Sequence, residues 1–175
     1  MTLPIMTAAA LAGSEVVTGW AARRADREGA VMRQIFQRFV DHGGPVAVAE
    51  VELALPDHPP GTVRQAVAAL DAGDLLQLRD DRIDIAYPFS SRPTAFVVRL
   101  ADGRVRFACC AIDALGMAPM LARRTRVESA CHHCGVGLAL AVGPDGPEAG
   151  AGAPSTGFMV WVETGYGPGR RITGL

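Results

Sequence analysis

The 175-residue sequence contains no lysine, and only 6% of its residues are aromatic. Its 17 basic side chains are balanced by 18 acidic ones, which leaves a formal net charge of −1. No chain-wide positive field is therefore available to hold nucleic acid or an anionic membrane surface. Uninterrupted apolar runs also fall short of the roughly 20 residues that a membrane-spanning helix needs, so we expect no membrane partner.

Signals for export are weak as well. Residues 1–13 are apolar, but they lack a basic start and are interrupted by Pro4 and Thr7, which does not fit a secretory signal. The four cysteines cluster in two short segments, as Cys109, Cys110, Cys131 and Cys134. Adjacent cysteines are poorly placed to cross-link distant loops, so the cluster indicates reduced thiols and a cytoplasmic location. With 49% hydrophobic residues, the chain can bury a core without disulfides.

The first half of the chain has a pattern typical of three helices followed by a β-hairpin. Apolar residues recur at spacings of three and four, and Gly or Pro ends each periodic stretch. The expected helices cover residues 28–43, 47–55 and 63–72, and the expected strands cover 75–78 and 83–87. We therefore predict a winged-helix-like domain at residues 1–88. Its third helix offers only Arg64 and Gln65 for DNA contacts, which favours a scaffolding role over DNA binding.

Residues 94–175 are predicted to form a second domain, after a linker at residues 88–93 that is rich in Pro and Ser. The expected strands cover residues 94–99, 105–108, 127–130, 137–142 and 158–162, and a buried helix is expected at 111–121. Residues 144–154 and 165–175 contain many glycines, which predicts a mobile loop and a tail that is either poorly ordered or lies over the site. The fold class is thus α+β, a three-helix domain followed by a small mixed α/β domain.

A helix that begins at residue 111 would place Cys110 at its N-terminus, with Asp113 three residues further on. Helix N-terminal amides stabilise a thiolate and lower its pKa, and a carboxyl group beside a thiolate has a raised pKa. Such a pair could bind a soft metal and handle one proton. The spacing also fits a small buried cysteine beside an aspartate that caps locally, and spacing alone favours that simpler interpretation.

The segment Cys131-His132-His133-Cys134-Gly135 has the spacing of a metal-binding knuckle, although by itself it is half a site. Together with Cys109 and Cys110 it would supply four thiols for zinc or copper(I), if the two segments meet in space. Because neighbouring side chains on a strand point in opposite directions, we expect at most three of the four to converge. A free surface pair or a redox pair fits the spacing equally well.

The segment from Arg106 to Leu115, Arg-Phe-Ala-Cys-Cys-Ala-Ile-Asp-Ala-Leu, supplies a family resemblance. It resembles the active-site segment of the organomercurial (alkylmercury) lyase family, in which a strand leads into Cys-Ala-(Leu or Ile)-Asp-(small)-Leu. The likeness continues in register through residues 119–131 to Cys134-Gly135, and the winged-helix arrangement also occurs in that family. It therefore covers most of the chain between residues 28 and 145.

The resemblance implies that Cys110 captures organic mercury as a thiolate and that Asp113 delivers a proton to carbon, with no cofactor required for lysis. In the family a later cysteine completes the coordination of the metal. Here no cysteine follows Cys134, and residues 157–162 read Gly-Phe-Met-Val-Trp-Val, so Cys109 or Cys134 would have to supply the second thiolate. The implied partners are a small organometallic ligand and low-molecular-weight thiols.

Two other functions also fit these residues. The chain could be a non-enzymatic zinc or copper(I) binding protein, or a metal-responsive regulator, that uses Cys131 and Cys134. It could instead be an enzyme that acts on a small metabolite through Cys110 and Asp113 without a metal. Our leading hypothesis is an alkylmercury lyase-like protein with catalytic Cys110 and Asp113. Its metal ligands would be drawn from Cys109, Cys110, Cys131 and Cys134.

Overall fold

The computed structural model describes residues 29–148 and residue 160. The first half of this part of the chain forms three helices and three short strands. They are α3 (Ala30–His42), β1 (Val46–Ala47), α4 (Val48–Ala54), α5 (Thr62–Ala72), β2 (Leu76–Arg79) and β3 (Arg82–Ala86). The predicted helices and hairpin are present within one or two residues of their expected bounds. The described helices include none that is both long and apolar enough to cross a bilayer.

Helix α3 forms because its apolar residues share one face, which packs into the core. Its buried residues are Val31, Met32, Ile35, Phe39 and Val40. The helix ends where Gly43 takes a left-handed conformation with φ 88°, which glycine adopts without steric cost. At Gly44, with φ 69°, a Cβ atom would lie 2.6 Å from the ring of Phe39. The Gly-Gly pair therefore lets the chain turn tightly against its own helix.

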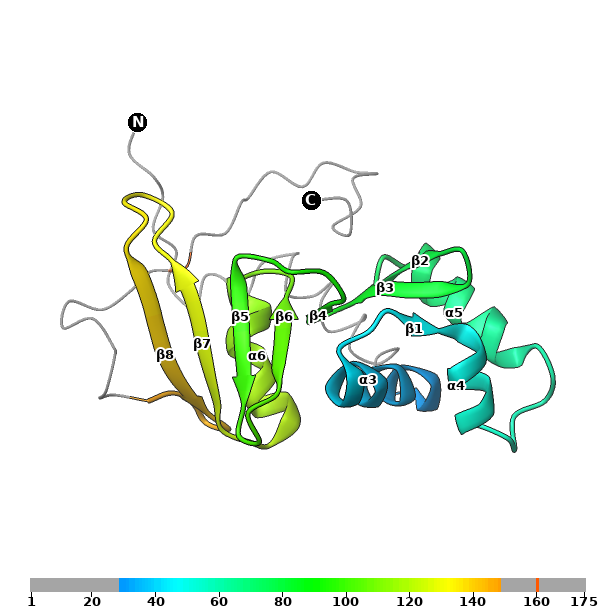
Figure 1. Ribbon diagram of the computed structural model, residues 1–175. Helices are drawn as coiled ribbons and strands as arrows, with labels where there is room; N and C mark the ends of the chain where they lie inside the picture. Colours follow the sequence, from blue (N-terminus) through cyan, green and yellow to red (C-terminus); the bar gives the residue numbers. More distant parts are fainter. Residues whose placement is uncertain (1–28, 149–159, 161–175) are drawn as a thin grey trace, which may run out of the picture.

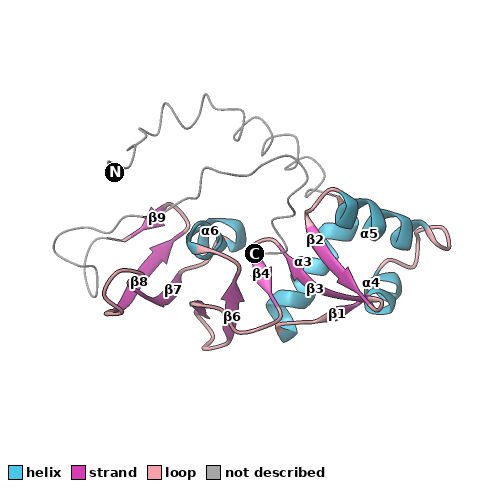
Figure 2. Ribbon diagram, turned by 90° about the horizontal axis from the view of Figure 1, so that it is seen from above, coloured by secondary structure: helices cyan, strands magenta, loops and turns pink. Residues whose placement is uncertain are grey.

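The second half adds six strands and one helix to the described structure. They are β4 (Phe89–Ser90), β5 (Phe96–Leu100), β6 (Val105–Ala108), α6 (Ala111–Leu121), β7 (Thr125–Ala130), β8 (Gly137–Gly143) and β9 (Gly146–Pro147). All strand pairs are antiparallel, in the order β1-β3-β4-β6-β5-β7-β8-β9, with β2 on β3. Figures 1 and 2 show α6 beside strands β6 to β8, and α3, α4 and α5 gathered around β1 to β3. The fold is therefore α+β, as predicted.

Helix α6 covers the sheet of the second half with a narrow apolar face. Ala114, Met117 and Ala118 are buried in the spacing of one helical face. They join one hydrophobic cluster that also contains Met32 and Phe39 of α3. The two halves thus share a continuous core. Because α6 is anchored along its length, its first turn is held at the end of β6.

Two predictions about connecting segments are wrong. Residues 88–93 were expected to be a linker, but Phe89 and Ser90 form β4, which pairs with β3 on one side and β6 on the other. Residues 144–154 were expected to be a loop, but within the described part of this segment Gly146–Pro147 forms β9 after a tight turn and pairs with β8. Residues 149–154 lie outside the described residues. Strand β4 makes the sheet continuous across the chain. The predicted strand at 158–162 (residue 160 excepted) and the predicted tail at 165–175 lie outside the described residues.

Two arginines of the second half hold the last carbonyl groups of α3. Arg106, 7% exposed, donates hydrogen bonds from Nε and Nη2 to the carbonyl oxygen of Val40. Arg104 donates from Nη1 to the same oxygen at 2.9 Å. The C-terminal carbonyls of a helix lack partners within the helix and carry partial negative charge. These guanidinium groups therefore fix α3 against β6, which is the strand that leads into α6.

Candidate functional site

Cys110 lies at the junction between β6 and α6, where it caps the helix. Its backbone is extended, with φ −147° and ψ 179°, and its Sγ accepts a hydrogen bond from the backbone N–H of Asp113 at 3.4 Å. The Cys110 sulfur is therefore the N-cap acceptor of α6, a position that a serine or aspartate oxygen occupies more often. Cys110 is an exposed residue. A ligand can therefore approach the thiol that the helix holds in place.

The Asp113 side chain lies beside the Cys110 thiol, because the backbone N–H of Asp113 donates to that sulfur and the carboxylate raises the pKa of the thiol. The pKa of Cys110 is raised to about 12, first because neighbouring groups partly remove water from the sulfur even though the residue as a whole is exposed, and second because the Asp113 carboxylate lies beside it. Backbone N–H groups of Asp113 and Ile112 act in the opposite direction, but they are outweighed. The prediction of a thiolate with a lowered pKa is therefore wrong: at neutral pH the sulfur keeps its proton.

Cys109 faces the turn between β3 and β4. Its N–H donates to the carbonyl oxygen of Pro88 at 3.1 Å, and its thiol donates to the carbonyl oxygen of Phe89 at 3.4 Å. The residue is half-buried. These two bonds continue the pairing of β4 with β6, in which Phe89 lies opposite Ala108. The sulfur of Cys109 is thereby directed toward the turn that carries Tyr87.

Tyr87 is a residue near this centre that the sequence did not single out. It lies in the two-residue turn between β3 and β4, where Ala86 pairs with Phe89, and it is 8% exposed. Its pKa is raised well above its ordinary value by burial and then by the nearby groups Cys109, Asp74, Asp113 and Cys110, in that order. A tyrosine followed by proline at the end of a strand indicates a turn, but nothing in that pattern indicates a neighbouring thiol.

Cys131 and Cys134 come together in the turn between β7 and β8. The carbonyl oxygen of Cys131 accepts a hydrogen bond from the N–H of Gly135 at 2.8 Å, which closes the turn. The pKa of Cys131 is lowered because the backbone N–H groups of Cys134 and His133, and then the Cys134 thiol, point at its sulfur. The turn therefore favours a thiolate at Cys131, in contrast to Cys110.

The two cysteine segments emerge at the same end of the sheet but on different strands. Ala108 of β6 pairs with Phe96 of β5, and the next residue, Val97, pairs with Glu128 of β7. Two strand spacings thus separate β6 from β7, which amounts to about 9.5 Å. Among residues 29–148 and residue 160, no three His, Cys, Asp or Glu side chains are grouped to hold a metal ion. The structure therefore presents two separate thiol sites instead of one four-thiol site.

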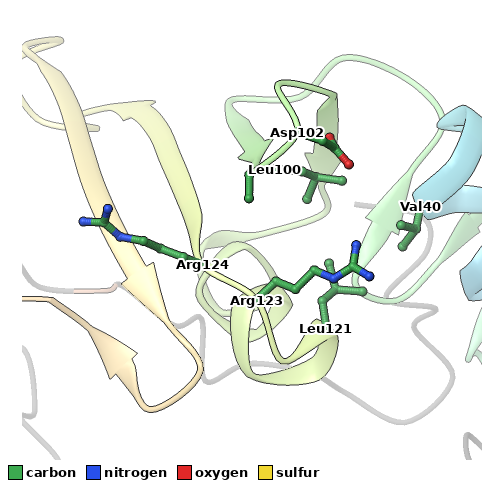
Figure 3. A pocket seen from close by; sticks show the side chains of 7 residues that line it. Val40, Leu100, Asp102, Leu121, Arg123 and Arg124 are labelled. Atoms are coloured by element: carbon green, nitrogen blue, oxygen red, sulfur yellow. The ribbon is translucent and has the colours of Figure 1, made fainter.

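A cavity of about 280 Å³ lies at the other end of α6 (Figure 3). Its lining residues are Val40, Leu100, Ala101, Asp102, Leu121, Arg123 and Arg124. Helix α6 has 11 residues, so this cavity lies about 16 Å from Cys110. Figure 3 shows Arg123 directed toward Leu121 and Val40, while Arg124 points away to its ion pair with Glu148. The cavity contains no thiol and is distinct from the site at Cys110.

Comparisons with known proteins place this geometry in context. Residues 89–167 match the family model described as alkylmercury lyase. A solved structure described as the mercury-bound form of MerB2 has a TM-score of 0.61 and 24% sequence identity. That match covers 77% of this chain and 66% of the other chain, slightly less than two thirds of its length. No curated protein matches the chain.

Proposed function

We propose that this chain, whose residues 89–167 match the alkylmercury lyase family model, binds an organomercury cation through Cys110 and cleaves the carbon–mercury bond with the proton held by Cys110 and Asp113. The observation that carries this proposal is the cap of α6, in which the Cys110 sulfur accepts the backbone N–H of Asp113 at 3.4 Å and the Asp113 carboxylate therefore lies close enough to raise the pKa of the thiol. Thiols are soft ligands that suit soft metal ions, and a neighbouring carboxyl group is a suitable general acid.

In the first step the mercury of R–Hg⁺ bonds to Sγ of Cys110, and the thiol proton passes to the carboxylate of Asp113. The raised pKa of Cys110 ensures that this proton is present on the thiol at neutral pH. Substrate binding therefore protonates Asp113. The charge balances, because the cation and the carboxylate are converted into a neutral mercury thiolate and a neutral carboxylic acid. The carboxylate lies beside the thiol, which gives the proton a short path.

In the second step Asp113 gives its proton to the carbon that is bonded to mercury. The electron pair of the carbon–mercury bond forms the new C–H bond, R–H leaves, and Hg²⁺ stays on sulfur beside a regenerated carboxylate. A second thiolate is then required to complete linear coordination of the ion. We assign this role to Cys109, because its sulfur lies at the same junction, whereas Cys131 and Cys134 lie two strands away. Low-molecular-weight thiols would remove the ion by exchange.

The proposal is tested by incubating the reduced protein with methylmercury and excess thiol, and by measuring methane and inorganic mercury. We expect both products in equal amounts from the wild-type protein and from Cys134→Ser, and neither product from Cys110→Ser. We expect Cys109→Ser to form methane in a single turnover, because the second thiolate acts after the carbon–mercury bond has broken, and to retain the mercury ion more weakly against the added thiol. Absence of both products from the wild-type protein would reject the lyase function.

A second candidate function is binding of zinc or copper(I) at the Cys131–Cys134 turn. It is supported by the backbone N–H groups that point at the sulfur of Cys131 and lower its pKa, because such bonds stabilise a thiolate before a metal arrives. If this is the function, the purified protein should carry one equivalent of metal by elemental analysis. That metal should be lost in the double variant Cys131→Ser, Cys134→Ser and kept in Asp113→Ala. A metal-free wild-type protein that takes up neither ion would contradict it.

A further inference from the structure

The hydroxyl group of Tyr87 is buried without a hydrogen-bond partner. Among the described residues, only Arg38, Tyr87 and Thr125 have a buried side-chain nitrogen or oxygen in this condition. Buried polar groups in folded proteins almost always have partners, because losing water without a replacement bond is unfavourable. The neighbours of Tyr87 indicate why this buried hydroxyl has no partner in the resting protein.

The pairing of β4 with β6 brings Tyr87 close to the Cys109–Cys110 junction. Phe89 pairs with Ala108 in the antiparallel β4–β6 ladder, and the carbonyl oxygen of Pro88 accepts the N–H of Cys109. Tyr87 and Cys110 are the residues next to this hydrogen bond on the two segments. The acidic groups near enough to raise the pKa of Tyr87 are Cys109 and Cys110 at this junction, Asp113 in the first turn of α6, and Asp74, which is 9% exposed, before β2. Every one of them can accept a hydrogen bond once it is ionised.

We propose that Tyr87 is a positioning residue whose hydroxyl donates a hydrogen bond to the Asp113 carboxylate as that group gives its proton to carbon. This inference rests on the proposed function. In the resting protein the carboxylate lies beside the protonated Cys110 thiol. Once mercury has replaced the thiol proton, the sulfur can no longer act as a donor, and negative charge develops on Asp113 as the proton leaves. A donor that gains its partner only at this stage stabilises the transition state more than the resting state.

The burial of Tyr87 makes this role chemically consistent. The raised pKa of the phenol keeps the hydroxyl protonated, so it serves as a donor and does not compete with Asp113 for the proton that is transferred. Its place in the turn between two paired strands fixes the ring without help from the hydroxyl. Removal of the oxygen alone should therefore leave the turn intact.

The test compares Tyr87→Phe with Thr125→Val, which removes the other buried hydroxyl that has no partner. Thr125 is 3% exposed and lies in β7, so the two substitutions delete the same kind of group at different places. We expect Tyr87→Phe to lower kcat for methane formation by about tenfold or more with little change in KM. We expect Thr125→Val to retain wild-type turnover. Neither variant should have a lower Tm, because each removes an unsatisfied polar group.

A second measurement does not depend on lysis. At a fixed pH, iodoacetamide should modify Cys110 at the same rate in Tyr87→Phe, in Thr125→Val and in the wild-type protein, because the hydroxyl has no partner before mercury binds; the modified site is identified by peptide mass. If the wild-type protein releases no methane, the proposed function fails, and this inference fails with it. If the wild-type protein releases methane, wild-type turnover in Tyr87→Phe would overturn this inference alone, and so would a changed alkylation rate, which would show that the hydroxyl already acts on the resting thiol.

Discussion

Replacement of Asp113 by asparagine is expected to lower the rate of methane formation from methylmercury by roughly 10²–10⁴-fold, the usual contribution of a general acid. The amide has nearly the same size as the carboxyl group, but it can neither take the thiol proton nor deliver it to carbon. Binding of methylmercury should persist, because it depends on Cys110. The measurement is a single-turnover assay of methane, with the exposed carboxylate Asp145 replaced by asparagine as the control.

The same substitution should make the Cys110 thiol more acidic. The raised pKa of Cys110, about 12, results first from lost hydration and second from the Asp113 carboxylate. Removing the negative charge should therefore lower the pKa, although it should stay above the ordinary value because the sulfur remains desolvated. Alkylation of Cys110 at neutral pH should then become faster while methane formation becomes slower. Misfolding would also expose the thiol and speed its alkylation, so the Tm of Asp113→Asn must match that of the wild-type protein. An unchanged thiol pKa would contradict the proximity of Asp113 to Cys110.

Local sequence patterns were sufficient to predict most of the elements that position the site. Helix α6 has the predicted bounds, and the strands before and after it lie within two residues of theirs, because apolar periodicity and turn residues act over short stretches. The proximity of Cys110 and Asp113 follows from helical geometry alone. A residue at a helix start and another three positions later are neighbours in any fold.

Features that depend on contacts between distant segments could not be predicted in this way. The pKa of Cys110 was expected to fall, because helix amides are visible from the sequence, whereas the desolvation that outweighs them comes from packing. Tyr87 precedes Cys110 by 23 positions, and only the pairing of β4 with β6 brings their segments together. Segment 88–93 resembled a linker because its two prolines and two serines outweighed a single buried phenylalanine.

Phe89 shows how much this segment contributes to stability. Its side chain is fully buried, with its ring centroid 5.6 Å from that of Phe39 in a stacked arrangement and 6.0 Å from that of Phe36. Its backbone connects β3 to β6, and its carbonyl oxygen accepts the thiol of Cys109. One residue thus joins the helices of the first half, the sheet of the second half and the thiol centre.

Phe89→Ala is therefore expected to lower the free energy of unfolding by about 3–5 kcal/mol, as for other buried aromatic residues. This is a large share of the roughly 5–15 kcal/mol that stabilises a typical domain. Chemical denaturation followed by circular dichroism measures the change. The control is Leu53→Ala, at a position that is 82% exposed, with an expected change within about 0.5 kcal/mol.

Since one core spans both halves, the wild-type protein should unfold in a single transition. Two separate transitions in the wild-type protein, or a Phe89→Ala variant as stable as the control, would show that β4 is the linker its composition suggested.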